Sequence, residues 1–202
     1  MAAAAQPIEA RSVRLTIWAA AILVLGTAVA FVLLYRSQGD VPAETYVVPF
    51  VAGYLVVMAA LLIASLMGVP SPAWRMPLRA AAGGGLLVLG VLALMSVGLP
   101  LIIAGALAIN AAAQTLRGRQ TTRAWLFSGA SVAVAVAVLM AGFAVSGRII
   151  TCPPIGSMAG GGSGFLTGPY YYDCVDGHLT YHSGTCNSDA IDANGHVTHP
   201  GC

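Results

Sequence analysis

The sequence contains no lysine, and charged residues make up only 8% of its 202 positions. Soluble domains usually carry about a quarter charged residues, so a water-facing surface of ordinary charge is excluded for most of the chain. Hydrophobic residues make up 58%, which is typical of proteins that cross a membrane several times. The formal net charge of +2, with basic residues confined to short segments, excludes a nucleic-acid-binding surface. The preference for Arg, Ala, Gly and Val is typical of a GC-rich bacterial genome.

Long segments lack charge altogether, and they predict an all-α polytopic membrane bundle over residues 1–150. Ala28-Val29-Ala30 resembles a signal-peptide cleavage site. The apolar run continues past it to Tyr35, so we expect the first segment to be retained. The expected transmembrane helices are 15–35, 45–68, 80–98, 100–116 and 124–147.

The stretch Ala80–Leu116 decides the number of crossings, because it holds no charge over 37 residues. As one helix it would be about 55 Å long, whereas two helices meeting at Gly98-Leu99-Pro100 would each just span a bilayer. Four crossings would divide the arginines five against four. Five crossings place seven arginines on one side and leave Arg36 and Arg148 on the other, and the positive-inside rule favours this division. The seven are Arg11, Arg14, Arg75, Arg79, Arg117, Arg119 and Arg123. We therefore expect a multi-pass cell-membrane protein with a cytoplasmic N-terminus and an extracytoplasmic C-terminal tail.

The expected crossings contain no Asp, Glu, His, Lys or Arg, which weighs against proton pumps and ion-coupled transporters. Their most polar pair is Asn110 and Gln114, four residues apart and so on one helical face. We expect a polar helix contact there, most simply a hydrogen bond between helices. Gly83-Gly84-Gly85 marks either a flexible helix entry or close packing, and small residues recur every fourth position from Gly129 to Ala141.

No cysteine precedes Cys152, and the tail after Ile150 is polar, with all four Cys and all four His. Residues 151–169 read as a Gly-rich linker, and residues 170–202 as a small exported β-hairpin module stapled by disulfides. Asp176-Gly177 and Asn194-Gly195 are hairpin turn signals within an internal repeat. The first turn would join strands 170–175 and 178–182, and the second would join 190–193 and 196–199.

The tail cysteines and histidines are compatible with disulfides or with a metal site. Position in the repeat predicts the disulfides Cys174–Cys186 and Cys152–Cys202. The alternative is a metal site of His178, His182, His196 and His199, but no close Cys pair accompanies the histidines. No Cys-x-x-Cys motif or complete calcium loop occurs, so we expect no metal and no cofactor.

These features predict a non-enzymatic membrane protein, an accessory subunit or envelope-facing anchor whose Cys-rich tail contacts a partner. The expected partners are the lipid bilayer and either a membrane or envelope protein or a second copy of the chain, and no nucleic acid. The alternative is a small uncoupled transporter or channel. A thiol-disulfide enzyme is the third hypothesis.

Overall fold

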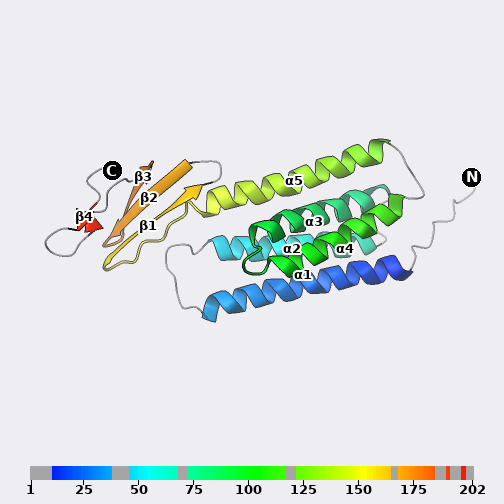
Figure 1. Ribbon diagram of the computed structural model, residues 1–202, viewed down its shortest axis with the longest axis horizontal. Helices are drawn as coiled ribbons and strands as arrows, with labels where there is room; N and C mark the ends of the chain where they lie inside the picture. The colour runs from blue at the N-terminus through cyan, green and yellow to red at the C-terminus, as the bar shows by residue number, and fades with distance from the viewer. Residues whose placement is uncertain are drawn as a thin grey trace, which may run out of the picture. The chain divides into compact units, whose positions relative to one another are not determined.

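The computed structural model describes residues 11–37, 46–67, 72–116, 122–164, 168–184, 190–191 and 197–198. These residues form two compact units, Met1–Ser37 with Val51–Ala141, and Gln38–Phe50 with Gly142–Cys202. The first unit is helical, and the second holds a small antiparallel sheet (Figure 1). Five helices and five strands are described: α1 Arg11–Ser37, α2 Val47–Leu66, α3 Pro72–Leu92, α4 Gly98–Leu116, α5 Thr122–Ser146, β1 Ser157–Gly164, β2 Gly168–Val175, β3 His178–Ser183, β4 Ala190–Ile191 and β5 Val197–Thr198.

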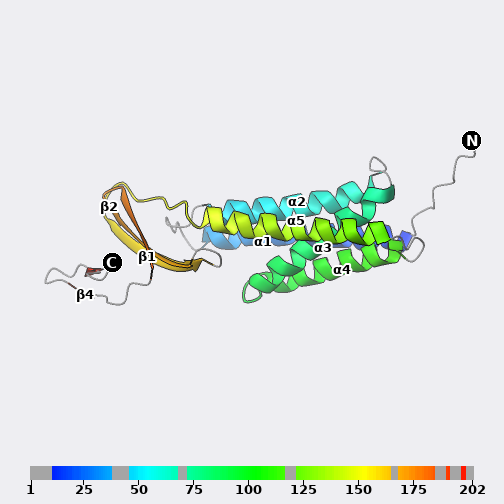
Figure 2. The same cartoon turned by 90° about the horizontal axis from the view of Figure 1, so that it is seen from above.

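Consecutive helices run in opposite directions within the helical unit (Figures 1 and 2). The starts of α1, α3 and α5 therefore lie at the same end as the ends of α2 and α4. This end, called the arginine end below, carries Arg11, Arg14, Arg75 and Arg79. Arg117, Arg119 and Arg123 were expected on the same side. Arg117 and Arg119 lie outside the described residues, and the side chain of Arg123 in α5 is not described.

The single-helix interpretation of residues 80–116 is wrong, because a turn over 93–97 separates α3 from α4. The break comes before the expected one: α3 ends at Leu92, and Gly98 begins α4 with Pro100 in its first turn. Four helices, α1, α2, α3 and α5, are long and apolar enough to cross a membrane, and α4 is a shorter apolar helix over Gly98–Gln114.

The beginning of α3 also differs from expectation. The third helix was expected to begin at residue 80, but it already begins at Pro72. Proline fits the first turn of a helix because its missing N–H is not needed there. Pro77, in contrast, lies inside the helix. The earlier start brings Arg75 and Arg79 into α3.

Apolar stripes on α1 and α2 face the helical core, with buried residues recurring every three or four positions from Val13 to Ala28 and from Val51 to Ser65. α3 is different, because every residue from Ala81 to Leu86 is buried and this part of the helix is therefore covered on all sides. Many large apolar side chains on the other helices point outward, among them Ile22, Val57 and Val134. An exposed apolar surface of this extent is unusual in a soluble protein and suits contact with lipid.

The sheet has the strand order β1-β2-β3, with β1 and β3 antiparallel to β2. The expected hairpin around Asp176-Gly177 is confirmed. Both turn residues have positive φ, 47° and 81°, as a tight two-residue hairpin turn requires. In the second expected hairpin, β4 pairs with β5 through Ala190–Thr198 and Ile191–Val197, while the turn Asn194-Gly195 lies outside the described residues.

The Gly-rich segment 151–169 was expected to be a flexible linker, and this is wrong for Ser157–Gly164, which form β1. The glycines of β1 have no side chains of their own, and side chains of β2 cover this strand. A Cβ on Gly160 would collide with the hydroxyl of Tyr172, which faces it across the two strands. Glycine therefore leaves room for the Tyr172 ring to lie over β1. The sequence of β1 by itself does not reveal this contact, so the strand was not predicted.

Candidate functional site

The three consecutive glycines of α3 are sites of close helix packing, each toward a different neighbour. The first atom met by an added Cβ would be Ile109 Cγ1 of α4 for Gly83, Val132 Cγ1 of α5 for Gly84 and the Tyr54 hydroxyl of α2 for Gly85. Of the two possibilities that the sequence left open, flexible entry and close packing, the structure has close packing. A side chain on any of the three would push a neighbouring helix away.

α3 and α4 approach each other through two pairs of glycines. A Cβ on Gly83 would lie 3.1 Å from the carbonyl oxygen of Gly105, and a Cβ on Gly105 would lie 3.0 Å from that of Gly83. Gly90 and Gly98 repeat this relationship one heptad away, near the turn. Two helices with glycines at matched seven-residue spacing can bring their backbones together along one face. The pairs therefore set the register of this helical hairpin.

Polar groups join α5 to α2 and α3 inside the unit. The hydroxyl of Tyr54 on α2 donates a hydrogen bond of 3.1 Å to the carbonyl oxygen of Ala135 on α5. Nearer the arginine end, Ser131 Oγ lies 2.9 Å from the carbonyl oxygen of Pro77 on α3 and 2.8 Å from that of Ser128 on its own helix. These bonds satisfy polar groups that would be costly to leave unpaired in an apolar interior.

Arg79 is fully buried at the arginine end of the unit. Its Nε donates to Ser65 Oγ at 3.2 Å, and its Nη2 lies 3.5 Å from the carbonyl oxygen of Ser65. Ser65 is the penultimate residue of α2, where carbonyl groups have no partner within the helix. A positive charge is also favourable at a helix C-terminus. Arg79 thus stabilises the end of α2 and ties it to α3.

The expectation that the third apolar segment holds no ionisable side chain was made for residues 80–98, and α3 extends beyond them. Its membrane-length segment, Trp74–Leu92, includes both Arg75 and Arg79. The expected helix start lay after Arg79 instead of at Pro72. Arg79 can be buried because its long side chain reaches the end of α2 and forms hydrogen bonds there. The hydropathy of the sequence does not reveal these contacts.

Asn110 and Gln114 share one face of α4, as expected, and Gln114 Nε2 donates to Asn110 Oδ1 at 3.4 Å. Both side chains are exposed, and the described bond runs along α4. A hydrogen bond from this pair to another helix stays a prediction. The small residues Gly129, Ala133, Ala137 and Ala141 of α5 are likewise exposed.

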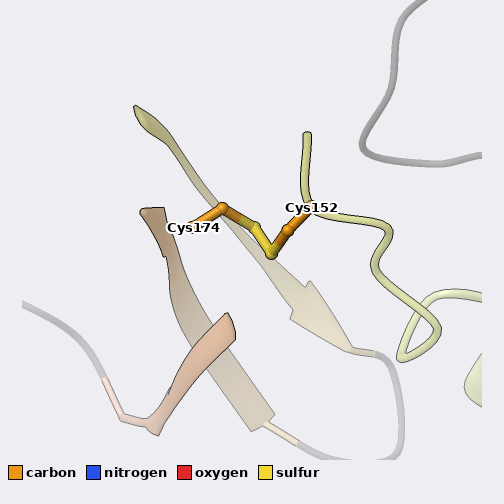
Figure 3. Close-up of a disulfide and its surroundings, with 2 residues drawn as sticks. All are labelled: Cys152 and Cys174. Atoms are coloured by element: carbon orange, nitrogen blue, oxygen red, sulfur yellow. A yellow bond between two sulfur atoms is a disulfide. The ribbon is translucent and has the colours of Figure 1, made fainter. Parts of the chain in front are cut away.

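In the second unit, the segment that follows α5 covers part of one face of the sheet, while Leu179 and Tyr181 on the same face are exposed. Tyr172 and Cys174 point to this face and are buried, and Tyr170, also on this face, donates from its hydroxyl to the carbonyl oxygen of Gly147 at 3.3 Å. Cys152 is joined to Cys174 by a disulfide with a Cα–Cα distance of 5.4 Å (Figure 3). The covered face is therefore attached covalently to the chain just beyond α5.

This disulfide corrects the expected pairs Cys174–Cys186 and Cys152–Cys202. In the hairpin, Cys174 lies opposite Leu179, and the pairing of β3 ends with Ser183 opposite Tyr170, before Cys186 is reached. The returning strand therefore cannot bring Cys186 to Cys174. Position in the repeat reflects the distance of each cysteine from the turn but not the strand register. Cys186 and Cys202 lie outside the described residues.

The opposite face, which we call the open face, consists of side chains that alternate with the covered ones. Tyr171 stacks on His182 with ring centroids 6.2 Å apart, and the Tyr171 hydroxyl donates to Asp173. The register places the remaining members beside them, so that the open face comprises Tyr171, Asp173, Val175, His178, Thr180 and His182.

Two histidines of the alternative metal site lie on β3. His178 and His182 are four residues apart. On a helix this spacing would bring their side chains together, but along a strand it separates their Cα atoms by roughly 13 Å. The pair alone therefore cannot chelate one ion. Among the described residues, no group of three or more His, Cys, Asp or Glu side chains is placed to hold a metal ion. His196 and His199 lie outside the described residues.

Sequence reasoning missed the buried Arg79, the glycine pairs of α3 and α4, and the third strand of the sheet. The seven-residue spacing shared by Gly83 and Gly90 and by Gly98 and Gly105 was the available signal for the pairs. No match was found for this chain among protein-family models, curated proteins or solved structures.

Proposed function

We propose that the chain is a non-enzymatic membrane anchor with five crossings, whose exported, disulfide-linked sheet binds a membrane or envelope protein. The N-terminus is cytoplasmic and the tail extracytoplasmic. Four of the six arginines whose side chains are described, Arg11, Arg14, Arg75 and Arg79, lie at one end of the helical unit, and this grouping supports the orientation. An exported location also suits a disulfide, since such bonds persist in oxidising compartments.

The difference between the two faces of the sheet supports the binding proposal. One face is fixed by the Cys152–Cys174 disulfide and by Tyr170, while the open face presents Tyr171, His182 and neighbouring polar groups. A surface of aromatic and hydrogen-bonding side chains on a rigid support is characteristic of protein-binding sites.

Burial of Cys174, the partner of the half-buried Cys152, favours a structural role over thiol–disulfide exchange. Cys174 is only 1% exposed, whereas catalytic or regulatory disulfides are usually accessible. Cys152 and Cys174 are also 22 positions apart, unlike the paired cysteines of a redox motif. The buried Arg79 bonds α3 to the end of α2. Such a contact stabilises a helical anchor, so a buried arginine does not by itself indicate a transport pathway.

Co-purification from native membranes in mild detergent tests the proposal. Val175 and Thr180 are exposed on the open face, so V175R and T180R should remove the partner while leaving the Cys152–Cys174 disulfide intact. I155R is the matched control, because Ile155 is 86% exposed but precedes the sheet. Equal recovery of the partner by all three variants, or recovery of no partner by the unmodified protein, would contradict the proposal.

A further inference from the structure

We propose that the arginine end of the helical unit binds the phosphate of an anionic lipid, with Arg75 as the principal contact. This inference rests on the membrane embedding of the proposed function, but not on a protein partner. Arg75 lies in the first turn of α3 and is half-buried. Its Nε is buried and has no hydrogen-bond partner among the residues that the structure describes. A buried guanidinium N–H without an acceptor is costly, which indicates a ligand that supplies one.

The chain offers no carboxylate along these helices. No Asp or Glu occurs between Glu44 and Asp173, so α2, α3, α4 and α5 contribute no negative charge to this end, where α3 carries Arg75 and Arg79. Glu9, which precedes α1, lies outside the described residues. An anion from outside the chain would balance the charge of Arg75.

The depth of Arg75 indicates which anion this is. Its neighbour Trp74 is 60% exposed, as is Trp125 near the start of α5. Exposed tryptophans mark the level of lipid headgroups in membrane proteins, so Arg75 lies at the depth of the lipid phosphates. Arginine binds phosphate through a planar pair of donors, and the free N–H groups at a helix start favour negative charge. A headgroup phosphate therefore fits in charge, chemistry and position.

The test uses the full-length protein in nanodiscs of phosphatidylcholine with increasing phosphatidylglycerol, and measures the thermal midpoint and the lipid retained in native mass spectrometry. We expect phosphatidylglycerol to raise the midpoint of the unmodified protein. R75Q should weaken the apparent lipid affinity by about tenfold or more, because it removes hydrogen bonds from a charged group to the phosphate. R36Q, at the opposite end of α1, is the matched control and should bind as the unmodified protein does.

R75K keeps the charge but not the planar pair of donors, and we expect an affinity between those of the unmodified protein and R75Q. This variant serves as the test if R75Q does not fold. Stabilisation by inorganic phosphate in phosphatidylcholine discs, equal to that by phosphatidylglycerol, would assign the site to free phosphate and overturn the lipid proposal. Equal losses in R75Q and R36Q would overturn the assignment to Arg75. Both results leave the partner-binding test of the open face unaffected, so the two proposals fail separately.

Discussion

Gly83 of α3 and Gly105 of α4 pack backbone against backbone, and a Cβ on either would lie within about 3 Å of the carbonyl oxygen of the other. The same relationship between Gly90 and Gly98 places a second close contact beside the turn. α3 is thereby held against α4 while Gly84 and Gly85 face α5 and α2. The helical unit is built around the one helix that carries Arg75 and Arg79.

Replacement of Gly85 by alanine tests this packing, because the new methyl group would collide with the Tyr54 hydroxyl. We expect G85A to lower the free energy of unfolding by about 1 to 3 kcal/mol, the usual effect of overpacking. Adding Y54F removes the hydroxyl and should recover part of the loss, although it also removes the bond to Ala135. Unfolding in detergent, followed by circular dichroism, measures the effect.

Gly53 provides the control for G85A, since a Cβ there would meet nothing within 4 Å. G53A should leave stability unchanged or increase it by up to about 1 kcal/mol through helix propensity. If G85A and G53A behaved alike, α3 would not be packed as described.

Arg79 should be required for the α2–α3 connection. R79L removes the donors that serve Ser65, and loss of hydrogen bonds from a charged group typically costs about 1.5 to 3 kcal/mol each. S65A should cost about 1 kcal/mol, because one neutral partner is lost. R148L changes an exposed arginine and should have little effect. Equal stability of R79L and R148L would show that the buried guanidinium does not stabilise this end.

The disulfide prediction concerns the tail. Peptide mapping without reduction should give Cys152–Cys174, which leaves Cys186 and Cys202 to pair with each other. C152S should destabilise the sheet by about 3 kcal/mol on the chain-entropy estimate for a loop of this length. Faster proteolysis after β2 would report the loss. A peptide joining Cys174 to Cys186 would contradict the described register.

Local sequence rules predicted the parts of the fold that depend on local chemistry. Asp176-Gly177 identified its hairpin because both residues accept positive φ, and the apolar runs identified all five helices to within a few residues, apart from the limits of α3. Contacts between distant segments were not predictable in this way. Gly160 belongs to a strand because Tyr172 covers it, and Arg79 is buried because α2 ends beside it. The pairing of Cys174 failed for the same reason, since it depends on register and on a third strand.

The topology can be measured directly with a membrane-impermeant thiol reagent on intact cells. Met95 is 97% exposed in the turn between α3 and α4, and five crossings place this turn outside and Gln120 inside. M95C should therefore be labelled in intact cells, while Q120C should be labelled only after permeabilisation. Labelling of Q120C in intact cells together with protection of M95C would contradict five crossings and, with them, the exported position of the sheet.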